Sequence, residues 1–240
     1  MFDKPNQLVF YANVLAIVFG AIIALFYDFI FTGLIFAICG ALLIFEQIRQ
    51  NKAAFTISDL KKILTIHDTG GSKATQTEKQ VTAACHVENK VYWFKNIPAI
   101  GSISNFRIEG ATLDDQKQEN GVHHLCAKIP AGLKATDGFD LTLSYDLKNA
   151  FTKTEGVLSH VVNDETRQLH LIVELPKGRP VTSAKVFCKH NGVEEALLPP
   201  VVTGQTKIES EIKDPILGAE YCLQWDWAEE SVAKKIGRMF

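Results

Sequence analysis

Aromatic and cationic side chains stand next to one another at one point of the sequence. Trp93 lies within Lys90–Lys95, where three aromatic residues are flanked by two lysines, and Arg107 follows soon afterwards. Aromatic rings stack on nucleic-acid bases, while lysine and arginine contact phosphates. We therefore predict that Trp93 stacks on a ligand and that Lys95 and Arg107 contact its negative charge. Aromatic residues are also favoured in strands, so the alternative is that these rings belong to a core.

Two further groups of cations stand in predicted turns. Lys177 and Arg179 belong to the turn Lys-Gly-Arg-Pro, and Arg167 belongs to the turn of residues 164–168. Cations in turns are usually only solvated. They gain interest because an oligomer would repeat them around its axis. The predicted ligand-binding residues are therefore Trp93, Lys95, Arg107, Arg167, Lys177 and Arg179.

Sequence motifs typical of enzymes are missing. The chain has no Gly-x-Ser-x-Gly, no P-loop, no His-Glu-x-x-His and no Gly-x-Gly-x-x-Gly. His123 and His124 are adjacent, so on a strand they would point to opposite faces and could not share one metal ion. The five cysteines contain no Cys-x-x-Cys pair. We predict no enzymatic activity, no cofactor and no metal site.

Two uncharged apolar runs near the start must be placed before any site can be positioned. They cover residues 8–27 and 29–45 and are separated by Asp28. About 20 apolar residues in a helix cross a bilayer core of ~30 Å. The runs therefore predict a transmembrane helical hairpin over residues 1–50. A signal peptide, with an apolar stretch of ~7–15 residues, or a buried soluble hairpin are the alternatives.

Charge placement around the hairpin predicts its orientation. Lys4 precedes the first run, and Arg49 and Lys52 follow the second, so both ends are expected to be cytoplasmic.

Asn13 and Asp28 are the predicted pore residues. Several copies of Asp28 would form an acidic ring that favours cations. Alternatively, Asp28 only marks a solvated turn.

The remaining chain alternates with period two and carries frequent turn signals such as Asn120-Gly121 and Asn191-Gly192. We predict a linker over residues 51–62, a β-sandwich over 63–227 and an amphipathic tail over 228–240. The predicted strands cover residues 63–67, 80–87, 90–97, 104–108, 123–129, 139–146, 157–162, 169–174, 184–190, 207–212 and 220–227. Tyr221, just after Gly218, resembles the tyrosine corner of immunoglobulin-like sandwiches. The predicted fold class is thus an N-terminal two-helix transmembrane hairpin plus an all-β, immunoglobulin-like antiparallel sandwich in the cytosol.

This arrangement resembles the small two-helix membrane effectors of bacterial anti-phage defence. These include CBASS and type III CRISPR membrane effectors and, most similar, the channel subunit of the Hailong system. The resemblance covers the layout of the chain and no residue motif. It implies a channel in the bacterial inner membrane that acts in abortive infection. It further implies a homo-oligomer, taken as a tetramer, gated by a nucleotide or short DNA oligomer. A nucleotidyltransferase encoded nearby would make that signal.

The net charge of −2 provides no overall basic field for nucleic acid, which does not favour a DNA ligand. A second function from another class therefore stays open. In that alternative, the chain is a membrane-tethered protein-interaction scaffold, and its β domain binds partners through strand edges or loops.

Overall fold

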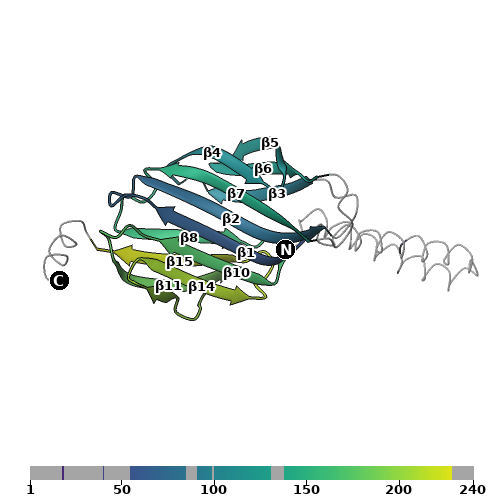
Figure 1. Ribbon diagram of the computed structural model, residues 1–240. Coiled ribbons are helices and arrows are strands. Elements are labelled where there is room, and N and C mark those ends of the chain that lie inside the picture. Colours follow the sequence, from purple (N-terminus) through teal and green to yellow (C-terminus); the bar gives the residue numbers. More distant parts are fainter. Residues whose placement is uncertain are drawn as a thin grey trace, which may run out of the picture. The chain divides into compact units, whose positions relative to one another are not determined.

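The computed structural model describes residues 55–84, 91–98, 100–130 and 138–228, together with Val18 and Gly40. The chain divides into two compact units, Met1–Ala53 and Ala54–Phe240. The fold below is that of the second unit. Its described residues form fifteen strands in three sheets (Figure 1).

The largest sheet, which we call the large sheet, has eight strands and is mixed. Seven follow one another in the order β13-β14-β10-β1-β2-β7-β4, and β9 also pairs with β1. β1 pairs with β10 and β9 in parallel, and with β2 in antiparallel fashion. The strands are β1 (Phe55–Ile66), β2 (Lys73–Ala84), β4 (Ser102–Glu109), β7 (Gly138–Lys148), β9 (Glu165–Thr166), β10 (Gln168–Glu174), β13 (Val201–Thr203) and β14 (Lys207–Lys213).

Two smaller sheets accompany it. The three-stranded sheet has the order β3-β6-β5 and lies near β4 and β7, whereas the four-stranded sheet has the order β12-β11-β15-β8 and lies near β10 and β14 (Figure 1). Their strands are β3 (Val91–Pro98), β5 (Thr112–Glu119), β6 (Val122–Lys128), β8 (Glu155–Val161), β11 (Val181–His190), β12 (Val193–Ala196) and β15 (Glu220–Trp227).

Alternating apolar residues build one core shared by the three sheets. On β7, every second residue from Leu141 to Leu147 is buried, as expected for a strand with one face on a core. Leu125 from the three-stranded sheet and Leu223 from the four-stranded sheet join the same cluster. Burying one such side chain stabilises the fold by roughly 1.5–3 kcal/mol. The large sheet therefore holds both smaller sheets on its apolar face.

The predicted fold class is wrong, although its all-β part agrees with the structure. An immunoglobulin-like sandwich consists of two antiparallel sheets. Here the described strands form three sheets, and β1 and β10 run parallel. A parallel pair cannot be joined by a tight hairpin, so the strand order departs from a sequential antiparallel arrangement. β1 also begins at Phe55, inside the stretch predicted as a linker.

The predicted transmembrane hairpin is corrected as well. Among the described residues, no helix combines the length and apolar character needed to cross a bilayer. This finding contradicts the two-helix hairpin and, with it, the description as a transmembrane protein and the predicted inner-membrane location. Apart from Val18 and Gly40, the predicted hairpin lies outside the described residues, as do Asn13, Asp28 and residues 229–240 of the tail.

Candidate functional site

The inward face of β2 is polar, whereas that of neighbouring β7 is apolar. Its residues Gln76, Glu78, Gln80 and Thr82 are all buried, and β1 places buried Lys62 directly opposite Glu78. The edge strands of the two smaller sheets add polar groups of their own. We call this cluster the polar seam: Lys62, Gln76, Glu78, Gln80, Thr82, Tyr92, His160 and Asp164.

Contacts within the polar seam connect all three sheets. Lys62 Nζ and His160 Nδ1 each lie 3.9 Å from Glu78 Oε2, which is too long for a direct hydrogen bond. Tyr92 Oη lies 3.3 Å from Gln80 Oε1 and 3.2 Å from Asp164 Oδ2, and its single proton can be donated to either oxygen. The seam is therefore a loosely bonded cluster between the edge strands β3 and β8.

Burial dominates the protonation of this cluster. It raises the pKa of Glu78, with the charge of Lys62 acting against the rise, and it lowers the pKa of Lys62. Burial likewise holds the pKa of His160 well below its usual range and raises the pKa of Asp164. Each shift favours the neutral form, because a charge is poorly solvated away from water. His160 is consequently neutral at pH 7.

The space beside the polar seam is very small. A cavity of about 10 Å³ is lined by Glu78, Tyr92, Trp93, Lys95 and Asp164, among others. This is close to the minimum for one water molecule. Three buried polar atoms of β2, Gln76 Nε2, Gln80 Nε2 and Thr82 Oγ1, have no hydrogen-bond partner among the described residues. The seam concentrates titratable groups, as active sites do, but leaves no room for a substrate.

Acidification is expected to destabilise the domain through His160. The folded-state pKa of His160 is lowered from 6.5, so below pH 6.5 the unfolded chain binds a proton that the folded chain does not. The contribution of neutral His160 to the stability of the fold is therefore fully present above pH 6.5 and is lost as the pH falls below it. Urea unfolding at about pH 7.5 and about pH 5.5 should show a smaller decline for His160→Gln than for the native chain. Equal declines in stability in the two proteins would contradict this role of His160. Any pH effect of Glu78 is present in both proteins and therefore cancels in the comparison.

The six predicted ligand residues occupy three separate places. Trp93 and Lys95 line the small cavity, and Arg167 follows Thr166, another lining residue. Lys117 Nζ lies 5.3 Å from the Trp93 ring centroid, close enough for a cation–π contact. The structure thus places Trp93 and Lys95 at one small cavity, with Arg167 next to a residue that lines it.

The other three predicted residues lie elsewhere. Arg107 on β4 pairs with Asp146 at 3.0 Å. Arg179 is buried: its guanidinium stacks 3.8 Å from the Trp227 ring centroid and donates to the carbonyl oxygens of Thr69 and Ala228. Lys177 shares that turn, which is separated from Arg167 by all of β10, about 20 Å. The structure therefore gives Arg179 a packing role.

One candidate site, an exposed apolar stretch, was not predicted from the sequence. Residues 193–203, which we call the edge segment, contain β12, β13 and the connection between them. Leu198 is 86% exposed, Val201 67% and Val193 65%. β12 is an edge of the four-stranded sheet and β13 an edge of the large sheet. The signal was present in the run Leu-Leu-Pro-Pro-Val-Val, which has no charge and no strand alternation.

The described sheet edges differ in how they are protected against pairing with other chains. β3, β4 and β5 each carry an irregular register, a common protective device. β12 carries Glu194 and Glu195. β13 carries neither a charge nor a register shift, and its protection is limited to its three-residue length and the two prolines before it. Among these five edge strands, β13 is thus the one that carries neither of these two protective features.

Comparison with known proteins does not identify a family. No protein-family model matches the chain, and no curated protein matches it in sequence. Among solved structures, a putative protease from Parabacteroides distasonis ATCC 8503 is 9% identical, with a TM-score of 0.46 over 72% of this chain and 40% of that one. Yeast LTA4 hydrolase in complex with bestatin is 11% identical, with a TM-score of 0.42 over 71% and 28%.

An M1 zinc metallopeptidase from Deinococcus radiodurans is 10% identical, with a TM-score of 0.39 over 71% of this chain and 42% of that one. The present chain spans less than half the length of each of these three proteins. With TM-scores below 0.5, the likenesses carry no argument about function.

Proposed function

We propose that the β domain is a non-enzymatic protein-interaction module and that the edge segment is its contact surface. The observation that carries this proposal is the exposure of Val193 on β12, Val201 on β13 and Leu198 in the connection between these two edge strands. Contiguous exposed apolar residues mark sites of protein association. An unprotected strand edge adds unpaired backbone groups that a partner's extended segment can bond.

The polar seam supports binding over catalysis. Its titratable groups are covered, and the adjoining cavity of about 10 Å³ is far below the ~300–1,000 Å³ of ordinary small-molecule sites. Among the described residues, no group of three His, Cys, Asp or Glu side chains is placed to hold a metal ion. The seam instead joins the edges of the two smaller sheets over the large one.

This proposal corresponds to the second function predicted from the sequence, restricted to the β domain. Gating by a nucleotide or short DNA oligomer, the homo-oligomer and the nucleotidyltransferase partner stay predictions. Of the residues predicted for that ligand, Trp93 and Lys95 are near one another, but they adjoin the carboxylate of Asp164 in the same small cavity.

Photo-crosslinking tests the proposal. Benzoylphenylalanine placed at Leu198 of the full chain, in its own cells, is expected to give a discrete adduct with another polypeptide, identified by mass spectrometry. The matched control is the same probe at Gln116, an exposed residue of the charged edge strand β5. Adducts from Leu198 no stronger or more discrete than those from Gln116 would contradict the proposal.

A further inference from the structure

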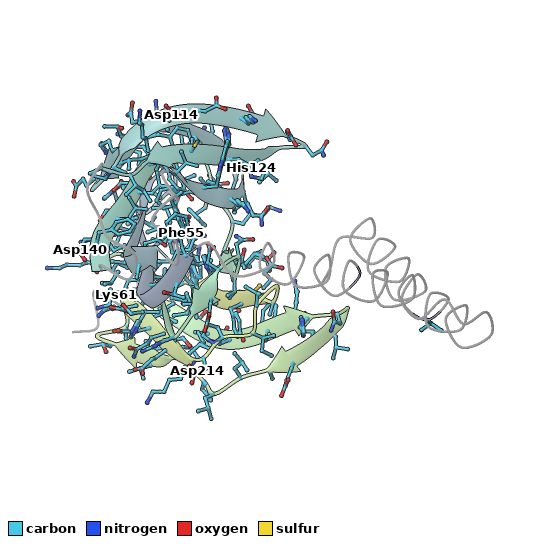
Figure 2. All side chains as sticks on the ribbon, turned by 90° about the vertical axis from the view of Figure 1, so that its right-hand side faces the viewer. Phe55, Lys61, Asp114, His124, Asp140 and Asp214 are labelled. Carbon is cyan, nitrogen blue, oxygen red and sulfur yellow. The ribbon has the colours of Figure 1, made fainter. Side chains whose placement is uncertain are left out.

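A hollow of about 260 Å³ lies on the outer face of the large sheet. It is formed over β1, β2 and β7, and we call it the outer hollow. Figure 2 shows Lys61 and Asp140, two of its residues, on the side of the large sheet away from the smaller sheets. The hollow is smaller than the ~300–1,000 Å³ sites that enclose drug-sized ligands. Any ligand it accepts is therefore small.

Strand register arranges the charges of the outer hollow in two rows. Asp59, Val81 and Asp140 are opposite one another across β1, β2 and β7. Two residues further along each strand, Lys61, Lys79 and Thr142 form the second row. The spacing within a strand separates the rows by about 7 Å. The hollow thus has an acidic row around a valine, beside a basic row that ends in a hydroxyl.

Two features of these rows are expected to destabilise the sheet when no ligand is bound. Lys61 and Lys79 are directly opposite, and like charges in that position destabilise a strand pair. Lys61 is compensated by Asp59 at 3.2 Å, whereas exposed Lys79 has no ion pair within the described chain. Asp59 Oδ1 is buried and accepts no hydrogen bond from any described residue, although His170 Nε2 lies 3.4 Å away.

A register shift in β1 helps to place Asp59 in this row. The shift falls between Ile57 and Asp59, so that Ile57 and Leu60, three residues apart, are both buried. Such β-bulges redirect side chains and are frequent beside binding sites. Asp59 is only partly exposed, next to Val81, which is 39% exposed.

We infer that the outer hollow binds a small zwitterion of the α-amino-acid class. The ammonium group would lie between the carboxylates of Asp59 and Asp140, and the carboxylate would meet Lys79 and the Thr142 hydroxyl. An apolar side chain would cover Val81. Two acidic and two basic groups favour a ligand with both charges, because a singly charged ligand would be repelled by one row. This site is separate from the edge segment and does not depend on the proposed function.

Calorimetric titration of the full 240-residue chain tests this inference. The probes are L-leucine, leucinamide, which lacks the carboxylate, and N-acetyl-leucine, which lacks the ammonium group. We expect leucine to bind at least 10-fold more tightly than either analogue. Leucinamide binding as tightly as leucine, or no heat from leucine up to about 10 mM, would overturn the inference.

Variants assign each charge to its row. Lys79→Ala should weaken leucine binding at least 10-fold and leave leucinamide unchanged, whereas Asp140→Ala should weaken leucine and leave N-acetyl-leucine unchanged. Lys73→Ala, an exposed lysine of β2 outside the hollow, is the matched control and should bind leucine like the native chain. Circular dichroism confirms that each variant is folded. Equal affinities in Lys79→Ala, Asp140→Ala and the control would contradict the proposed placement.

Discussion

Replacing Lys62 by Met is expected to destabilise the domain by about 3–5 kcal/mol. Lys62 is buried, and the substitution would leave the buried carboxylate of Glu78 without its cation. Glu78 could then avoid the free-energy cost of a buried, unpaired negative charge only by binding a proton. Its pKa is already raised by burial, so the loss should be smaller at about pH 5 than at about pH 8. Urea unfolding at the two pH values measures both the loss and its sign.

The double variant Lys62→Met, Glu78→Leu separates loss of a charge pair from loss of packing. Exchanging a buried ion pair for apolar residues of similar volume is neutral or stabilising by about 1–4 kcal/mol. The double variant should therefore unfold at or above the urea midpoint of the native chain. A double variant as unstable as Lys62→Met alone would contradict this account, because the loss would then come from packing around Lys62 and not from an unpaired charge on Glu78.

Substituting Gly156 by Ala is the second change with a large expected effect. Gly156 lies on β8 opposite Trp225, and an added Cβ would come within 2.6 Å of Trp225 Cε2 and closer still to Cζ2. The ring is only 1% exposed and contacts Phe151, so it cannot move into solvent. Overpacking of this kind costs about 1–3 kcal/mol. The expected result is a lower thermal midpoint.

Gly138→Ala is the matched control for this prediction. Gly138 also lies in a strand, β7, but an added Cβ there meets no atom within 4 Å. Its effect on the free energy of unfolding should stay within about 0.5 kcal/mol. Equal effects at Gly138 and Gly156 would contradict the packing described around Trp225.

Sequence patterns identified the strands whose two faces differ. The strand predicted over residues 139–146 is confirmed by β7, and that over 123–129 by β6, to within two residues. β2 was predicted only over residues 80–87, because its inward residues Gln76 and Glu78 are as polar as its outward ones. β5 was not predicted, since all eight of its residues are exposed and no alternation marks it.

A correct local motif did not yield the correct topology. Tyr221 Oη accepts a hydrogen bond from the backbone amide of Ile216 at 2.9 Å, which is the bond expected of a tyrosine corner. The immunoglobulin-like fold predicted with it is nevertheless wrong. The corner reports a turn within a few residues, whereas the parallel pairing of β1 with β10 joins residues more than 100 positions apart. Short-range spacing contains no signal for that pairing.

The candidate sites likewise depend on contacts between distant residues, which local sequence patterns do not reveal. Lys95 was predicted from its aromatic neighbours, and the structure places it in the small cavity. Arg179 was predicted as an exposed turn cation, but Trp227, 48 residues later, covers it. The zwitterionic arrangement of the outer hollow depends on the register of three strands, which no stretch of sequence specifies alone.

The central claim, that the edge segment binds a protein partner, is tested most directly by the affinity of the partner captured at Leu198. Its dissociation constant should be measured for the native chain and for Leu198→Asp combined with Val201→Asp. We expect at least a 10-fold loss of affinity, with an unchanged thermal midpoint because both side chains are exposed. An unchanged affinity in the folded double variant would contradict the claim.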